Sequence, residues 1–311
     1  MSAGWVSASQ GRALVSVIVP TYDGERYVAE AVSSALAQSH RDLEVIVVDD
    51  GSSDRTLDVV ARFTDRRVRV FQRPNGGVAA ARNTGVGAAR GEFVAFLDQD
   101  DAWRPEKLAE QLPRFAAPQV AIVGSLMTYI GPSGQAIGIS GEIADHQQER
   151  IAALRLMPFA PSSMVVRSSV LREFGGFDEE LAQHVAPVDD FDFVSRVAQR
   201  YRIVTVPRSL GYYRIHSEAG SFASFHAMRR AAYYLRARRD DPALTWDRWE
   251  ATVRDGLSTR RRDRARYLYR LAGLRIASGR TVRGLAPLAG AVALAPRYSI
   301  RRLRWQRRRV T

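Results

Sequence analysis

The sequence predicts an α/β fold built on a doubly wound, mostly parallel sheet, and three observations support this prediction. Short runs of apolar and β-branched residues alternate three times with segments of helical periodicity between residues 14 and 97. The connections between these segments are short, as in strand–helix–strand units. Two of the apolar runs end in carboxylates, and open α/β sheets bind ligands at the carboxyl ends of their strands.

The first half of the chain carries the regular alternation. Residues 14–19 are rich in valine and end before Pro20, which favours a first strand there. Residues 27–36 repeat apolar side chains at helical spacing. Further strands are expected at 43–48, 68–71 and 93–97, and further helices at 56–63 and 78–89. The last of these helices has a face of small residues, which lets a backbone or a ligand approach closely.

Beyond residue 97 the alternation is less regular. Helices are expected at 107–115, 169–174 and 188–197, strands at 120–125, 162–167, 203–206 and 210–216, and a hairpin or mobile loop at 131–141. Arginine and alanine dominate from about residue 221, with helices expected at 228–238, 245–257, 261–278 and 282–294. We therefore divide the chain into a disordered lead-in (1–13), an α/β domain (14–220) and a small, basic helical appendage (221–311).

The composition excludes several classes of protein. With 311 residues, 46% of them hydrophobic, the chain can bury a large core and is not disordered. It has no cysteine, so any metal must bind carboxylates or histidines, and there is no cysteine nucleophile. Residues 1–12 lack the apolar core of a signal peptide, and no apolar run is long enough to cross a membrane. We therefore expect a cytoplasmic protein.

The net charge of +13 is concentrated in one part of the chain. Residues 1–228 carry 23 basic and 27 acidic side chains, whereas residues 229–311 carry 23 basic and 6 acidic ones. Arginines flank the apolar stretch 285–294, which is too short to span a bilayer. This pattern favours helices that lie on an anionic membrane surface, the inner face of the cell membrane. The alternative is a soluble appendage that covers a sheet edge or forms an oligomer contact.

Three groups of carboxylates are candidate site residues. The first, Asp98, Asp100 and Asp101, directly follows the apolar run 93–97. Aspartates so close together repel one another unless a cation neutralises them, and Mg²⁺ or Mn²⁺ accepts such oxygen ligands and can hold a diphosphate. The alternative is a solvated acidic turn in which Asp101 caps the following helix.

The other two groups flank a strand and a helix. Asp49 and Asp50 follow the strand 43–48. Asp189, Asp190 and Asp192 open a helix, where acids also complement the positive end of the helix dipole.

Six short motifs occur in an order that points to a known family. They are VIVPTY (17–22), VVDDGSSDRT (47–56), ARNTG (81–85), FLDQDD (96–101), GGFD (175–178) and YRIH (213–216). Together they resemble the successive signatures of family 2 glycosyltransferases, which are inverting enzymes of the GT-A fold. The resemblance covers about residues 15–217. It implies transfer of a sugar from a nucleoside-diphosphate donor to an acceptor hydroxyl.

The resemblance implies a nucleotide pocket at the ends of the first two strands. Thr21, Tyr22, Asp49 and Asp50 would line the base and ribose pocket. A carboxylate suits the imide N–H of uracil or thymine, which favours UDP or dTDP donors, and the Tyr22 ring can stack on a base. Arg82 would reach the base or the diphosphate. The alternative is an ion pair from Arg82 to Asp49 or Asp50.

Asp98-Gln99-Asp100 resembles the DXD motif of the family. Asp98 would bind ribose or metal, Asp100 would bind the Mg²⁺ or Mn²⁺ that bridges the diphosphate, and Asp101 would complete the shell through water. Such an ion stabilises the leaving nucleoside diphosphate. His216 matches a histidine that the family places near the metal or diphosphate, and a surface histidine is the alternative.

Asp189 and Asp190 stand where the family commonly has Glu-Asp before an aromatic residue, here Phe191. The resemblance implies that Asp190 is the general base that takes the proton of the acceptor hydroxyl. Asp192 competes for this role. The acceptor would be a glycan or a lipid-linked glycan of the cell envelope, bordered by residues 131–141 and the segment near 184.

Two other classes fit the sequence less well. A nucleotidyltransferase should have a glycine-rich loop with Arg or Lys directly after the first strand, and residues 20–23 are Pro-Thr-Tyr-Asp. The basic C-terminal part suggests a nucleic-acid-binding protein. However, the α/β part is slightly acidic, and the basic tail lacks interleaved aromatic residues for base stacking.

Overall fold

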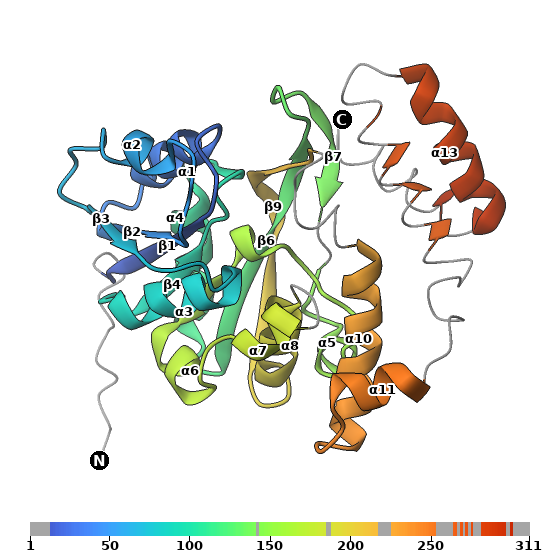
Figure 1. Cartoon of the computed structure of the whole chain (residues 1–311). Coiled ribbons are helices and arrows are strands. Elements are labelled where there is room, and N and C mark those ends of the chain that lie inside the picture. Colours follow the sequence, from blue (N-terminus) through green and yellow to red (C-terminus); the bar gives the residue numbers. More distant parts are fainter. Residues whose placement is uncertain are drawn as a thin grey trace, which may run out of the picture.

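The fold is described from a computed structural model of the chain (Figure 1). The described residues are 13–140, 143–184, 188–216, 225–252, 264–265, 268–269, 271–272, 275, 281–296 and 299–300. Residues 1–12 of the predicted lead-in 1–13, the boundary near 220, most of the predicted helix 261–278 and the tail from 301 lie outside them. In the described part we find no helix with both the length and the apolar character needed to cross a membrane.

A mixed sheet forms the centre of the α/β part. Its strands run in the order β3-β2-β1-β4-β8-β6-β9-β5, and β7 pairs with β6 outside this path. The pairs within β3-β2-β1-β4 are parallel, as is β6–β9, and the other pairs are antiparallel. The strands are β1 (Val15–Thr21), β2 (Leu43–Asp49), β3 (Val68–Gln72), β4 (Phe93–Phe96), β5 (Ala102–Trp103), β6 (Val120–Ile130), β7 (Ala136–Ser140), β8 (Val165–Arg167) and β9 (Arg202–Arg214).

Helices lie between and after these strands. They are α1 (Val28–Leu36), α2 (Thr56–Val60), α3 (Val78–Ala88), α4 (Lys107–Gln111), α5 (Gln148–Ala152), α6 (Ser168–Glu173), α7 (Glu179–His184), α8 (Asp189–Val197), α10 (Phe225–Asp240), α11 (Trp246–Thr252) and α13 (Thr281–Leu294). The predicted α/β class is thus confirmed, and antiparallel pairs extend the parallel strands beyond β4.

Alternate residues of β1 face opposite sides of the sheet, as the pleat of a strand requires. Val15, Val17 and Val19 pack with α1 in one apolar core, whereas Ile18 packs with Ala79 of α3 in a second core. Because every residue of β1 and β2 is buried, helices must cover both faces of this half of the sheet. The sheet is therefore doubly wound, as predicted.

Helix α4 is shorter than the predicted helix 107–115. It ends at Gln111 and continues as a 3₁₀ helix over Leu112–Ala116, because Pro113 has no N–H to donate to the preceding turn. Lys107, the only lysine of the chain, is fully buried at the start of α4. Its Nζ donates to Gln111 Oε1 at 2.7 Å and lies 4.1 Å from the centre of the Trp103 ring. Burial lowers the pKa of Lys107 well below its usual range.

Strand β9 replaces the two strands predicted on either side of Pro207. Val206 pairs with Ser125 and Ser209 pairs with Leu126, so Pro207 and Arg208 bulge from the ladder with β6. A bulge tolerates proline because no ladder hydrogen bond needs its N–H. The predicted hairpin near 131–141 is present over its described residues, where β7 folds back on β6.

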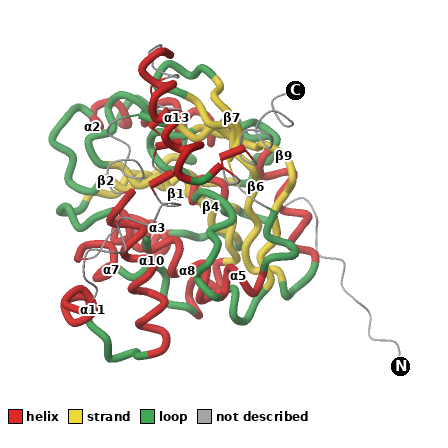
Figure 2. The backbone as a smooth tube through the Cα atoms, turned by 90° about the vertical axis from the view of Figure 1, so that its right-hand side faces the viewer, coloured by secondary structure: helices red, strands yellow, loops and turns green. Residues whose placement is uncertain are grey.

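The C-terminal helices α10 and α11 pack against the α/β part beside α7 and α8 (Figures 1 and 2). A separate apolar cluster, which we call the C-terminal core, joins them to it. Its buried members are Leu154, Leu181, Val188, Ala231, Tyr234, Leu235 and Trp249. Helix α13 lies apart from α10 and α11, at the upper right of Figure 1.

Candidate active site

The candidate site lies at the carboxyl ends of β1, β2 and β4. These parallel strands end on the same edge of the sheet, so the segments after Thr21, Asp49 and Phe96 meet there. Arg82 of α3 and Asp189 of α8 join this edge through ion pairs. Residues from five elements thus converge, as expected for a ligand site in an open α/β sheet.

Arg82 is the centre of the site. Its Nη2 donates to Asp98 Oδ1 and its Nη1 donates to Asp189 Oδ2, both at 2.8 Å, and the residue is only 4% exposed. Burial alone would lower the pKa of Arg82, but nearby carboxylates raise it overall. The guanidinium therefore stays charged and holds the end of β4 beside the start of α8.

Small residues let α3 bring Arg82 to this position. Gly85 lies one turn after Arg82, and a Cβ atom there would sit 2.5 Å from Ile18 Cγ2 of β1. Ala79, Ala80 and Ala81 are also buried. The predicted face of small residues thus packs against the sheet, and close packing places the arginine at the strand ends.

Asp190 follows the ion-paired Asp189 at the start of α8 and is half-buried. Burial and the neighbouring charge of Asp189 raise the pKa of Asp190 to about 7. Arg82 and the N–H of Phe191, which donates to Asp190 Oδ1 at 2.7 Å, oppose this shift. A half-buried carboxylate with a pKa near neutrality suits a general base.

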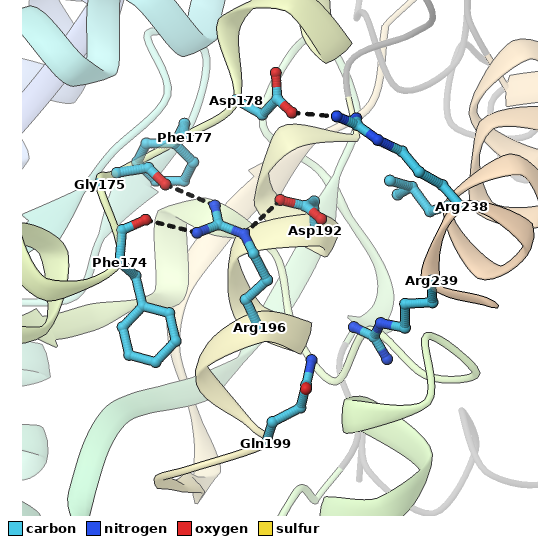
Figure 3. Close-up of a pocket in the computed structure, with 11 residues that line it drawn as sticks. Phe174, Gly175, Phe177, Asp178, Asp192, Arg196, Gln199, Arg238 and Arg239 are labelled. Carbon is cyan, nitrogen blue, oxygen red and sulfur yellow. Dashed lines mark hydrogen bonds and ion pairs between the residues drawn. The ribbon is translucent and has the colours of Figure 1, made fainter. Parts of the chain in front are cut away.

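Asp192 is directed away from this group. Its Oδ2 accepts from Arg196 Nε at 2.7 Å on the same helix. Figure 3 shows Asp192 turned toward Arg196 in a cavity of about 480 Å³ between α8, α10 and the loop at Gly176. Arg196 also donates to the carbonyls of Phe174 and Gly176. The structure therefore does not bring Asp192 together with Arg82. Asp192 instead holds Arg196, whose contacts fix the GGFD loop on α8.

Gln99 joins the ends of β4 and β1. Its Oε1 accepts from Thr21 Oγ1 at 2.6 Å and from the Tyr22 N–H at 2.8 Å, and its Nε2 donates to the Tyr22 carbonyl. Thr21 is buried, whereas the ring of Tyr22 is available to a ligand because this residue is 47% exposed. The middle residue of Asp98-Gln99-Asp100 is thus structural.

Asp100 and His216 are brought together as predicted, with His216 Nε2 2.9 Å from Asp100 Oδ2. Arg214, which sequence reasoning did not single out, fixes this contact. Its Nε donates to the Asp100 carbonyl, its N–H donates to Asp101 Oδ1, and its Nη2 donates to Glu30 Oε2 at 2.6 Å. Arg214 is part of the YRIH motif, so the motif was a signal that could have identified it.

Asp101 is almost completely buried, and burial followed by the charges of Asp100 and Asp98 raises its pKa well above the usual range. Its Oδ2 has no hydrogen-bond partner among the described residues. The expected alternative, a solvated acidic turn, does not describe this buried carboxyl.

Asp49, the last residue of β2, and Asp50, which follows it, have different hydrogen-bond partners. Asp50 accepts from the N–H groups of Gly76 and Gly77 and lies 3.3 Å from Arg73 Nε. Asp49 accepts from the Ser52 N–H at 3.2 Å, while its buried Oδ1 has no partner among the described residues. The alternative for Arg82 was an ion pair with Asp49 or Asp50. In the structure Arg73, and not Arg82, pairs with Asp50.

The residues at the strand ends fit a divalent cation that binds together with a diphosphate. No group of three or more His, Asp or Glu side chains in the described part is arranged as a complete metal site. Asp100 and His216 nevertheless present an adjacent carboxylate and imidazole, with Asp98 two residues away. Mg²⁺ typically binds one or two carboxylates, several waters and substrate phosphates, so a complete protein cage is not required.

Comparisons with known proteins identify the family and the fold. The sequence model described as Glycosyl transferase family 2 matches residues 16–175. The putative teichuronic acid biosynthesis glycosyltransferase TuaG of Bacillus subtilis is 45% identical over 102 residues, which are 32% of this chain and 40% of TuaG. The matched segments span 65% or less of the length of the first curated relatives.

Two solved structures share the fold. S. aureus TarS 1–349 in complex with UDP-GlcNAc matches with a TM-score of 0.58 at 22% identity, over 90% of this chain and 83% of that one. The mannosyltransferase PcManGT from Pyrobaculum calidifontis, in complex with GDP-Man and Mn²⁺, also matches with a TM-score of 0.58 at 22% identity, over 91% and 76%.

Proposed function

This chain belongs to glycosyl transferase family 2, and from that premise we propose that it transfers a sugar, with inversion, from a nucleoside-diphosphate donor to an acceptor hydroxyl. The observation that carries the proposal is the ion-pair bridge through Arg82. It joins Asp98, at the strand ends where the donor would bind, to Asp189, which precedes the half-buried Asp190. Donor and acceptor sides of a displacement are thereby held at one place.

The environment of Asp49 supports a UDP or dTDP donor. Its buried Oδ1 lacks a partner among the described residues, and the imide N–H of uracil or thymine would satisfy it once the groups that cover this oxygen move aside. Tyr22 directly follows Thr21, which pairs with Asp49 across the sheet, and its exposed ring is available for stacking. The TarS complex contains UDP-GlcNAc, whereas the PcManGT complex contains GDP-Man, so donors of both kinds are included in the test below.

Asp100 and His216 would hold a Mg²⁺ or Mn²⁺ ion, with Asp98 beside them. The ion would stabilise the charge that develops on the departing diphosphate. Asp190 would accept the proton of the acceptor hydroxyl, since its raised pKa suits proton transfer near neutral pH. Arg82 keeps the carboxylates of Asp98 and Asp189 in fixed positions while this occurs.

We propose a glycan or lipid-linked glycan as the acceptor. TuaG, to which the chain is similar, is named for teichuronic acid biosynthesis, and this supports an acceptor of the cell envelope.

The function is tested with the full-length protein and a panel of UDP, dTDP and GDP sugars. In the presence of Mn²⁺, a UDP or dTDP sugar should raise the thermal midpoint, because ligand binding stabilises the folded state by mass action. That sugar should then release its nucleoside diphosphate at a rate that EDTA and Asp100→Asn abolish. Glu106→Gln, at a half-buried acid outside the site, is the matched control. No binding or turnover of any sugar in the panel would contradict the function.

A further inference from the structure

Helix α10, which the sequence assigns to a basic appendage, packs directly on the start of α8. Val188, just before Asp189, is a buried member of the C-terminal core with Tyr234 and Leu235 of α10. Phe191, just after Asp190, packs against the same core. The residues on both sides of Asp189 and Asp190 therefore rest on α10, and Figure 2 also shows α10 beside α8.

Arg239 adds a polar link between α10 and α8. Its Nη2 donates to Ser195 Oγ at 2.8 Å, and its Nη1 donates to the carbonyl of Ala152, the last residue of α5. Ser195 Oγ in turn donates to the Asp192 carbonyl at 2.8 Å, and Ser195 is fully buried. One guanidinium thus ties the end of α5 to a backbone group in the first half of α8.

A second arginine of α10 secures the neighbouring turn. Arg236 Nε donates to the Leu154 carbonyl at 2.8 Å. Leu154 has a φ of 53°, a conformation that side-chain-bearing residues rarely adopt, and its side chain is buried in the C-terminal core. The turn after α5 is therefore held by contacts with α10, and it forms part of the surface on which α8 rests.

We propose that Arg239 is a positioning residue for the transfer reaction, which through Ser195 fixes the first turn of α8 and so the placement of Asp190. The proposal rests on the proposed function for the role of Asp190. Arg239 lies outside the group formed by Arg82, Asp98 and Asp189, so its loss should affect the acceptor-side carboxylate without altering the nucleotide pocket.

The test uses three variants of the full-length protein, Arg239→Gln, Arg239→Lys and Ser195→Ala, with Arg230→Gln as the matched control. Arg230 lies on the same helix but pairs with Glu250 of α11 at 2.7 Å. Three quantities are measured for each variant. They are hydrogen exchange of the α8 amides, the affinity for UDP with Mn²⁺, and nucleoside diphosphate release from the fastest donor of the panel.

Arg239→Gln and Ser195→Ala should each speed exchange in the first turn of α8 and lower turnover about tenfold, while UDP affinity changes less than about twofold. Arg239→Lys should recover part of the turnover, and Arg230→Gln should match the wild type. A further variant that combines Arg239→Gln with Ser195→Ala should be no slower than the slower of the two single variants, because both substitutions remove the same link.

Full turnover in both Arg239→Gln and Ser195→Ala would overturn the proposal, as would an equal loss of UDP affinity and turnover. Ser195→Ala carries the test if Arg239→Gln does not fold, because it removes one buried hydroxyl and leaves the contact of Arg239 with Ala152. If the wild type turns over no sugar, the proposed function fails. Exchange in α8 then still decides the link, since unchanged exchange in Ser195→Ala overturns it and faster exchange supports it.

Discussion

Asp49 and Asp50 are neighbours in sequence, but their carboxylates meet different groups. Asp50 accepts two backbone N–H groups of the turn before α3 and pairs with Arg73. Asp49 has one buried oxygen without a partner among the described residues. Burying an oxygen without a hydrogen bond is costly for the free protein, and a ligand that donates to this oxygen recovers that cost.

Asparagine at the two positions should therefore give different results. Asp50→Asn should destabilise the fold by about 1–3 kcal/mol, because an amide cannot accept as many hydrogen bonds and loses the charge facing Arg73. Asp49→Asn should leave stability nearly unchanged and weaken UDP binding about tenfold. Urea unfolding and calorimetric titration with UDP distinguish them. Equal losses of UDP affinity in the two variants would contradict the assignment of the base pocket to Asp49.

The pKa of Asp190 sets a pH dependence of activity. Because burial and Asp189 raise this pKa to about 7, the carboxyl is protonated below that pH and cannot act as a base. The value of kcat/KM for the donor should fall about tenfold for each pH unit below 7. Asp190→Asn should cut turnover by orders of magnitude at pH 7 and above and remove this pH dependence, while UDP affinity changes little. A loss of turnover in Asp192→Asn with full turnover in Asp190→Asn would reassign the base.

Ionisation of Asp190, which the activity requires, should lower the stability of the folded protein. The pKa of Asp190 is higher in the folded protein than the usual 3.8, so the folded state binds the proton more tightly than the unfolded chain. Its contribution to folding therefore improves as the pH falls from above 7 toward 4. Asp190→Asn should raise the thermal midpoint at pH 8, and this gain should shrink at pH 5.

At the scale of elements, the approach of α3 to β1 determines where Arg82 lies. A methyl group at Gly85 would meet Ile18 Cγ2 at 2.5 Å, whereas a methyl group at Gly87 on the same helix would meet nothing within 4 Å. Gly85→Ala should destabilise the fold by about 1–3 kcal/mol and reduce turnover, because α3 must move away from the sheet. Gly87→Ala should instead stabilise it by up to about 1 kcal/mol. Denaturant unfolding of the two variants checks this, and equal effects would show that α3 does not depend on close packing.

Elements with a strong periodic pattern could be predicted from the sequence. The strands near 43–48, 68–71 and 93–97 and the helix near 78–89 lie within two residues of β2, β3, β4 and α3. Short elements such as β5, α5 and α7 were not predicted, because two to six residues are too few to show a period. The continuity of β9 through Pro207 was also missed, since a bulge is fixed by pairing with β6 and not by local sequence.

The candidate site shows the same division. Asp100 and His216 were expected to lie together, and they do. The partners of Arg82 were not predicted, because Asp189 is 107 residues further along the chain and no local pattern links the two. The contact of α10 with α8 was also missed, since the arginine-rich composition favoured helices on a membrane surface and the alternative was an appendage that covers a sheet edge or forms an oligomer contact.

At the scale of the whole molecule, the excess of basic residues beyond residue 228 predicts binding to an anionic membrane surface. Leu285 of α13 is 54% exposed, and α13 is a mostly apolar helix with a single charged residue. Full-length protein should float with anionic vesicles at low salt and be released at high salt, because salt screens the attraction. Neutral vesicles are the control. Leu285→Asp and Gln at Arg301, Arg302 and Arg304 should reduce flotation, and unchanged flotation would remove this role from the segment. A truncation near Phe225 is unsuitable, because it would expose the C-terminal core.

The burial of Lys107 has a practical consequence. A protease that cleaves only after lysine has a single target bond in this chain, and the side chain that the protease must bind is fully enclosed in the folded protein. Native molecules should resist digestion, and each cleavage should follow an opening of the region around α4. When opening and closing are fast relative to cutting, the digestion rate measures the population of opened molecules. The rate of cleavage after Lys107 therefore measures unfolding of the unlabelled protein.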